Sequence, residues 1–295
     1  MKKFLSLSFL IIFSILFLSG CAEKKPQFIT PSEAAKKVVQ ICKEDYSLDI
    51  ITHQMGNTLW IYLPFKHHLI DYKAATDPFA KMKKSGNKPD LEYIDGNFSA
   101  NSFNFEYSID NKNDFQKKDR GYTSLYTEEF QEAQRAVYTA LARAFGDSAE
   151  SGGEKLPEFI VTVITDLEKG LELESILYYE DLKRVSSNPP DLTQEEFLKR
   201  YVNELRGDVD GINDLTGKHI KYPDIQLPDF LTKQMINRIN FKFQNSDFPP
   251  TENSKDEIIQ IIQETLKAYQ FTDYQSIKLK DLKDDSNFVL EKDKL

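Results

Sequence analysis

The sequence predicts an α+β fold, in which a mainly antiparallel sheet is packed by amphipathic helices on one face. Three observations support this class. Apolar residues recur at helical spacing in several segments, they alternate with polar residues in another, and a Gly-Asn pair separates two β-rich runs.

The first predicted elements are a helix over residues 30–44 and a hairpin formed by residues 48–53 and 58–63. Thr30 and Glu33 have the spacing of a capping box, which favours a helix start. The Gly-Asn pair between the two runs tolerates positive φ, as a tight hairpin turn requires.

Alternation of aromatic and polar residues over 103–109 predicts a half-buried strand. A second helix is expected over 127–146, followed by strands over 159–164 and 171–178. This helix and its two strands repeat the order of residues 30–63. Either an internal duplication or a chance recurrence explains the repeated helix-hairpin order.

The last third is predicted to be mostly helical. A capping box at Thr193 precedes an apolar pattern that extends to Leu205, and further helices are expected to start near Asp229 and Ser254. Residues 276–280 are expected to form a last strand. The charged tail at 282–295 is expected to fray.

The composition predicts a globular chain. The 295 residues are 40% hydrophobic, which is too much for an acidic disordered chain, and two cysteines cannot form a disulfide scaffold. One domain is expected over residues 30–281. A boundary inside it near residues 186–193 is the alternative.

The first 21 residues carry the clearest signal. Two lysines precede an apolar run over residues 4–18, which is shorter than the roughly 20 residues of a membrane-spanning helix. Leu18-Ser19-Gly20-Cys21 follows. These residues resemble the lipobox of bacterial lipoproteins, and the mature part of the chain resembles no family that we can name.

The resemblance implies a signal peptide over residues 1–20, lipid attached to Cys21 and a short tether over 21–29. Lipidation (typically with palmitate or a similar chain) would anchor the chain to a membrane. Ala22, in place of Asp, resembles outer-membrane sorting in bacteria with two membranes. The expected location is therefore the cell envelope, on the periplasmic face of the outer membrane where one exists.

Net charge limits the partners. Removal of residues 1–20 deletes two lysines and no acid, so the formal charge of -9 becomes -11. A domain this acidic is not expected to bind nucleic acid or anionic head groups through its net field. The lysines at 66, 73, 81, 83, 84 and 88 form a basic region, which we interpret as a solvated loop because it contains few aromatic residues.

The sequence contains four histidines that are candidate metal ligands or catalysts. His67 and His68 are adjacent, so they point apart in a strand or a helix, and a surface role is favoured over a metal site. His53 lies in the predicted hairpin. His219 lies in a loop, where it either polarises a nucleophile or is simply solvated.

An acidic loop contains Asp208, Asp210 and Asp214, the weak candidates for a metal site. Clustered carboxylates suit calcium, but the order lacks a third ligand before Gly211 and a glutamate at the twelfth place of an EF-hand. Asp also fills turns by accepting hydrogen bonds from its own backbone. A turn is therefore favoured, and no metal or other cofactor is expected.

Other candidate chemistry is sparse. Glu172 and Glu174 share a strand face about 7 Å apart, which suits either paired-carboxylate hydrolysis or a solvated surface. Cys42 lies on an apolar helix face and is expected to be buried and inert. The tetrapeptide Ser85-Gly86-Asn87-Lys88 matches S-x-x-K, but no K-T-G partner accompanies it.

No catalytic residue is assigned from these patterns. The favoured function is an interaction or scaffold role in the cell envelope, with another envelope protein as partner. The alternatives are a tethered hydrolase, which would need a deep pocket joining His219 to an acidic residue, and a ligand-binding or calcium-binding lipoprotein.

Overall fold

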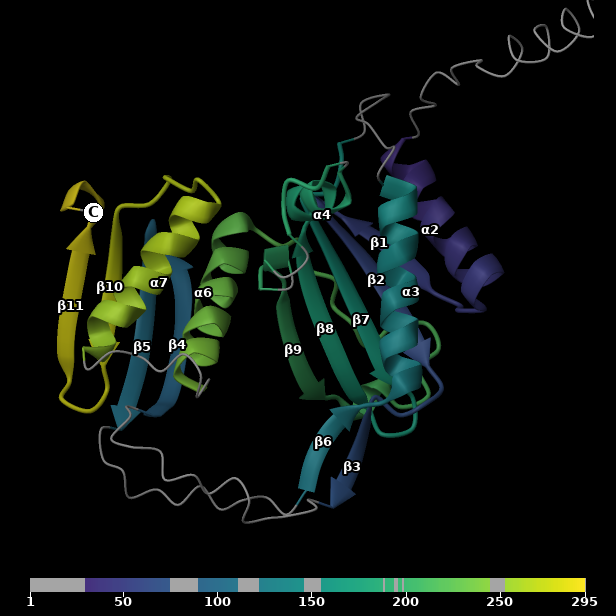
Figure 1. Cartoon of the computed structure of the whole chain (residues 1–295), viewed down its shortest axis with the longest axis horizontal. Helices are drawn as coiled ribbons and strands as arrows, with labels where there is room; N and C mark the ends of the chain where they lie inside the picture. The colour runs from purple at the N-terminus through teal and green to yellow at the C-terminus, as the bar shows by residue number, and fades with distance from the viewer. Residues whose placement is uncertain are drawn as a thin grey trace, which may run out of the picture.

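Two larger β-sheets, a two-stranded sheet and five α-helices form the described part of the computed structural model (Figure 1). The structure describes residues 30–74, 90–110, 122–145, 155–187, 189–193, 196–197, 199–244 and 253–294. The predicted signal peptide with Cys21, the tether, Ser85 to Lys88 and most of the lysine-rich region lie outside the described residues.

The first sheet is five-stranded and mixed. Its second and third strands are parallel, and all its other neighbours are antiparallel. The strands follow the order β1 (Ile51–Met55), β2 (Thr58–Phe65), β7 (Phe159–Asp166), β8 (Leu171–Tyr178) and β9 (Val202–Gly207).

Helices α2 (Pro31–Tyr46), α3 (Glu128–Phe145) and α4 (Tyr179–Ser186) pack with one face of this sheet. The predicted capping box starts α2, because Thr30 Oγ1 accepts from the Glu33 amide and the Glu33 carboxylate accepts from the Thr30 amide. The hairpin that follows turns at Gly56, whose φ of 55° is the left-handed conformation that glycine adopts without strain.

The second large sheet is four-stranded and combines an internal segment with the C-terminal part of the chain. Its order is β11 (Ser286–Glu291), β10 (Ser276–Asp281), β5 (Ser102–Asp110) and β4 (Asp90–Ser99), with β10 and β5 parallel. Helices α6 (Leu227–Gln244) and α7 (Ser254–Ala268) belong to this half. The remaining elements are the pair β3 (Ile70–Ala74) and β6 (Tyr122–Tyr126), and two short 3₁₀ turns, η1 (Val209–Gly211) and η2 (Lys292–Lys294).

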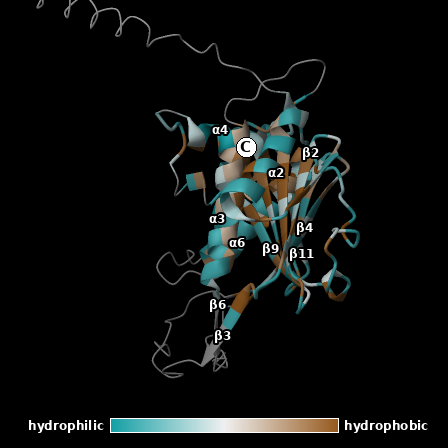
Figure 2. Ribbon diagram, turned by 90° about the vertical axis from the view of Figure 1, so that its right-hand side faces the viewer, coloured by the Kyte–Doolittle hydropathy of each residue, from teal (hydrophilic) through white to brown (hydrophobic). Residues whose placement is uncertain are grey.

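Two hydrophobic cores hold these layers together. One fills the space between the five-stranded sheet and helices α2, α3 and α4. The other joins the opposite face of that sheet to α6, α7 and the four-stranded sheet, with Phe159 and Phe230 in ring contact at 5.2 Å between centroids. Figure 2 shows the strands mostly brown and the outer faces of the helices largely teal.

The α+β class is therefore confirmed, but the arrangement of the layers differs from the expectation. Both larger sheets are mixed, and the five-stranded sheet is covered on both faces, not on one. The reason lies in its central strands: β2 and β7 are buried on nearly every residue, so neither face can be left to water.

Two expectations for the last third are wrong. The amide of Glu196 donates to Thr193 Oγ1 and residues 196–197 are helical, but the helix does not extend to Leu205. Strand β9 begins at Val202, because pairing with β8 overrides the helical pattern. Residues 286–291 do not fray but pair with β10.

The other predicted elements agree with the structure. The strand at 103–109, the second helix and the strands at 159–164 and 171–178 all form. The element order helix-strand-strand occurs twice in the first sheet, as α2-β1-β2 and α3-β7-β8.

Candidate functional site

A buried polar network lies where β7, β8 and β9 meet the loop that follows β9. Its centre is His219, whose side chain is only 5% exposed and stands on the loop between η1 and α6. Thr165 of β7, Glu172 of β8 and Arg206 of β9 face it from the sheet. The predicted solvated loop histidine is therefore wrong, because the loop folds back over the sheet.

The imidazole of His219 lies between two carboxylates. Nδ1 is 2.6 Å from Oδ2 of Asp214, and Nε2 is 2.7 Å from Oε2 of Glu172. The fully buried Glu172 also accepts a hydrogen bond from the Thr165 hydroxyl at 2.8 Å and pairs with Arg206 at 3.3 Å. The network thus joins three strands and the loop in one connected set of charged hydrogen bonds.

These contacts shift the pKa values of His219 and Asp214. Burial alone would lower the pKa of His219, but its hydrogen bonds with Asp214 and Glu172 raise that pKa above its ordinary value. Burial opposes ionisation of Asp214, but hydrogen bonds from His219 and Thr216 hold the pKa of its carboxyl well below its usual range. These contacts therefore favour the protonated ring of His219 more than in an ordinary histidine.

This arrangement differs from a nucleophilic triad. A general base needs one ring nitrogen directed at the nucleophile, whereas both nitrogens of His219 face carboxylates. The hydroxyl of Thr165, which belongs to the same network, donates to Glu172. His219 lines neither the groove at the start of β1 nor the cavity between α4 and α7.

Glu172 and Glu174 do share a strand face, as predicted, but they are not a solvated surface pair. Their exposed fractions are 0% and 6%. Arg206 bridges them, with Nε 3.3 Å from Glu172 and Nη2 3.4 Å from Glu174. A guanidinium between the two carboxylates fixes them as ion-pair partners, and Lys233 of α6 completes the neutralisation of Glu174 at 3.6 Å.

In the acidic loop, two of the three candidate metal ligands, Asp208 and Asp214, instead accept hydrogen bonds from backbone amides of the turn. The Asp214 carboxylate accepts from the backbone amides of Thr216, Gly217 and His219 in addition to the His219 ring. Asp208 accepts from the amide of Asp210, whose own side chain is exposed. Among the described residues, no group of three or more His, Cys, Asp or Glu side chains has a geometry that could hold a metal ion.

Above this network the loop exposes large apolar side chains. Val209 is 78% exposed, Leu215 is 56% exposed and Ile212 is 39% exposed. We call these three residues the apolar loop surface. Its backbone is held by the Asp214 turn and by the amide of Asp208, which donates to the carbonyl of Gly170 at 2.6 Å. These bonds fix the backbone that carries the three exposed side chains.

A groove of about 380 Å³ adjoins this surface at Leu215. It lies between the connection from α2 to β1 and the end of β2, and Lys66 and His67 stand on its rim. Its apolar lining is formed by Leu48, Ile50, Ile51, Leu63, Phe65 and Leu215.

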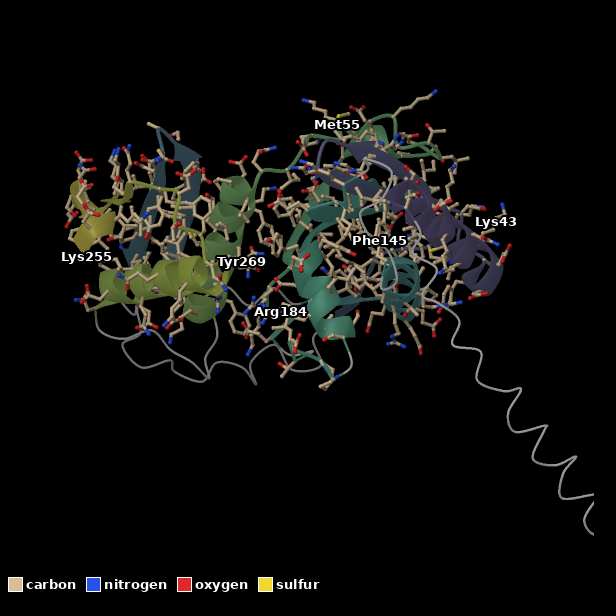
Figure 3. The ribbon with its side chains drawn as sticks, turned by 90° about the horizontal axis from the view of Figure 1, so that it is seen from above. Lys43, Met55, Phe145, Arg184, Lys255 and Tyr269 are labelled. Atoms are coloured by element: carbon tan, nitrogen blue, oxygen red, sulfur yellow. The ribbon has the colours of Figure 1, made fainter. Side chains whose placement is uncertain are left out.

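A second cavity of about 240 Å³ lies between α4 and the end of α7. Its polar centre is Asp181, 3.1 Å from Arg200 and 3.1 Å from the hydroxyl of Tyr269. Burial raises the pKa of Asp181 despite these partners. Figure 3 shows Arg184, which also lines this cavity, near Tyr269 at the junction of the two halves. The charged groups of this cavity pair with one another on the side of α4, and the hydroxyl of Tyr269 reaches them from the end of α7.

The remaining predicted residues stand apart from the network. His53 stacks on Tyr222 with ring centroids 4.4 Å apart, and His68 lies 3.2 Å from the buried Asp166. His67 packs on Phe65. Cys42 is a free, fully buried cysteine, which confirms its predicted burial, and burial raises the pKa of its thiol to about 11.

Sequence analysis missed Arg206, Thr165 and the apolar loop surface. Arg206 had no signal of its own, because its role depends on strand pairing that the helical prediction for this segment excluded. Val209, Ile212 and Leu215 did carry a signal, since three large apolar residues in an otherwise polar loop are unusual.

No family model, curated protein or solved structure matches this chain. Within the residues that the structure describes, no helix combines the length and apolar character needed to cross a bilayer.

Proposed function

We propose that this chain is a lipid-anchored protein of the bacterial cell envelope whose folded part binds another envelope protein. The anchor rests on the lipobox-like Leu18-Ser19-Gly20-Cys21, which would attach lipid to Cys21. Stable anchoring takes more than one acyl chain, as lipobox processing supplies. In a bacterium with two membranes, Ala22 favours the periplasmic face of the outer membrane.

The binding role rests on one observation above all, the apolar loop surface. Val209, Ile212 and Leu215 are exposed on a loop whose conformation is fixed from below by Asp214 and His219. Preorganised apolar side chains lose little conformational freedom on binding, so they contribute more of their burial energy to affinity. The net charge of -11 for the mature chain makes nucleic acid an unsuitable partner.

The position of this surface also suits a partner protein. In Figure 1, α2 begins near the top of the view, whereas β9 points to the bottom, so the loop after β9 lies at the opposite end of the sheet from the start of α2. A chain anchored ahead of α2 would therefore present the loop away from its own membrane surface.

A tethered hydrolase receives less support. His219 has no nitrogen left for a substrate or a nucleophile, and its side chain is nearly inaccessible.

We also propose that the repeated order α2-β1-β2 and α3-β7-β8 arose by duplication of a mainly antiparallel helix-hairpin unit. The two copies now meet at the parallel pair of β2 and β7.

Photocrosslinking in intact cells tests the binding role. A photoreactive amino acid at position 209 should capture a defined envelope protein, since Val209 is the most exposed residue of the apolar loop surface. The matched control is the same amino acid at Val289, which is 50% exposed on β11 in the other half. Capture at both positions alike, or at neither, would contradict the proposal.

A further inference from the structure

The open edge of the five-stranded sheet is β1, which has a neighbour on one side only in the described part of the chain. The direction of the backbone groups in β2 shows which residues of β1 point their amide and carbonyl groups away from the sheet. The Leu167 amide donates to the Phe65 carbonyl at 3.0 Å, and the Phe159 amide donates to the Asn57 carbonyl at 3.2 Å. Odd-numbered residues of β2 therefore direct their backbone groups at β7, and even-numbered residues direct theirs at β1.

The pairing register then assigns β1. Ile51, His53 and Met55 stand opposite even-numbered residues of β2, so their backbone groups form the ladder with β2. Thr52 and Gln54 alternate with them and direct their amide and carbonyl groups away from the sheet. Among the described residues, no backbone hydrogen bond from another segment reaches these two positions.

This edge lacks the usual protection. Proteins block open edges with charges, proline or a bulge, because a free edge pairs with other chains. The sequence of β1, Ile-Thr-His-Gln-Met, has no such device. By contrast, β9 contains Glu204 and Arg206, and β4 contains acidic residues and a bulge at Leu91.

The groove described above lies at the start of β1. A strand added along β1 would continue into it and place an apolar side chain against Ile50, Leu63 and Leu215. Lys66 and His67 at the rim are exposed, and neither forms an ion pair with the described residues, whereas the nearby Asp49 is paired with Lys43 at 3.0 Å. The rim therefore favours an acidic group.

We infer that the outer edge of β1 and this groove form one site for an extended segment of the partner protein, with an apolar anchor residue beside an acidic residue. The segment would bind by strand addition, through backbone bonds to Thr52 and Gln54. This inference rests on the proposed binding function, which it makes specific to one edge and one class of ligand.

A second copy of this chain fits the edge less well. Two β1 strands paired antiparallel are related by a two-fold axis perpendicular to the sheet, so the starts of the two α2 helices would lie at opposite ends of the joined sheet. Two chains anchored through Cys21 in one membrane would resist that arrangement. The partner segment is therefore assigned to a different protein.

The test uses a displayed library of random nine-residue peptides, selected on the immobilised full-length chain. Enriched peptides should share an apolar residue next to Asp or Glu. On the Lys66→Glu protein the enriched peptides should carry Lys or Arg in that place, whereas Lys278→Glu, an exposed charge reversal on β10, should leave the selection unchanged.

Two further comparisons separate strand addition from simple apolar contact. N-methylation of alternate backbone nitrogens in an enriched peptide should weaken its binding at least tenfold, because each methyl group removes a backbone donor. Leu215→Asp should weaken binding to a similar extent, and Leu205→Asp, on the exposed part of β9, should not.

The absence of an enriched class, or binding that tolerates both N-methylation and Leu215→Asp, would overturn the inference. Crosslinking at position 209 would still report on the proposed function in that case. Dimerisation of the full-length chain that is abolished by Thr52→Pro would instead assign the edge to a second copy, and would also overturn the inference.

Discussion

Nε2 of His219 lies 2.7 Å from Oε2 of Glu172, although 47 positions separate the two residues in the chain. This contact ties the loop after β9 to strand β8 of the five-stranded sheet. Because Glu172 is fully buried, the charge of its carboxylate depends on the partners that surround it. The stability of the loop and that of the sheet are therefore coupled through this pair.

Replacement of His219 should be among the more destabilising changes in the loop. His219→Gln removes a cation between two carboxylates, and we expect a loss of about 2–4 kcal/mol of unfolding free energy, moderated by the remaining contact of Glu172 with Arg206. Urea unfolding of the two proteins measures this loss of unfolding free energy. His67→Gln is the matched control, because the His67 side chain is exposed and pairs with no carboxylate among the described residues, and it should change stability by less than about 0.5 kcal/mol. Equal effects of the two variants would contradict the coupling.

His219 and Asp214 should make the stability of the protein depend on pH. The folded-state pKa of His219 is raised, so its contribution is complete below the unfolded pKa of about 6.5 and is lost as the pH rises through the folded value. The folded-state pKa of Asp214 is lowered, so its contribution is complete above about pH 4 and is lost only in strong acid. We expect the combined contribution of His219 and Asp214 to stability to be greatest between about pH 4 and 6.5.

Deprotonation has a structural reason to weaken the loop, since a neutral imidazole donates from one nitrogen only. Burial raises the pKa of Tyr222, which lies on the same loop, to about 12, so this phenol does not contribute to a change between pH 6 and 9. Urea unfolding at pH 6, 7.5 and 9 should show a decline that His219→Gln reduces. A decline of the same size in both proteins would assign it to other groups.

Local patterns explain which elements were predictable from the sequence. The α2 capping box at Thr30 and Glu33, the turn at Gly56 and the alternation along β5 each depend on residues close in the chain. The segment that starts at Val202 was misassigned because its helical spacing of apolar residues is a local signal, whereas its strand conformation depends on pairing with β8.

The candidate site was less predictable for the same reason. His219, Asp214 and Glu172 were each considered, but nothing local indicates that a loop histidine will reach a strand 47 positions earlier. Loop closure of this kind is decided by tertiary packing, here by the burial of Ile220 and by the hydrogen bond of Trp60 Nε1 to the Pro223 carbonyl at 3.0 Å.

Cys42 gives a prediction about packing. Cys42→Ser would place a hydroxyl in an apolar site and should lower stability by about 1–3 kcal/mol, while Cys42→Ala should cost less. Because burial raises the pKa of the thiol to about 11, the native protein should react slowly with a thiol reagent at pH 8 and rapidly after unfolding. Fast reaction of the native protein would show that the site opens.

Cys21→Ser tests the anchor. Without the sulfur that carries the lipid, the variant should incorporate no labelled palmitate and should leave the membrane fraction after a high-salt wash. The control is Cys42→Ala, which should keep the label, since Cys42 is buried in the folded part. Retention of Cys21→Ser on washed membranes would show that the lipobox interpretation is wrong.

The acidic loop gives the last prediction, because calcium binding would change the proposed function. Asp214 directs its oxygens at three backbone amides and at His219, and Asp208 accepts from a backbone amide, so few lone pairs remain for an ion. We therefore expect millimolar calcium to leave the melting temperature nearly unchanged. A true site at 100 times its dissociation constant would add ~2.7 kcal/mol, a shift of several degrees in a domain of this size. The exposed Asp210 supplies the control: a rise with calcium that magnesium does not reproduce and that Asp210→Ala abolishes would make this loop an ion site, and the apolar side chains above it would then be positioned by calcium.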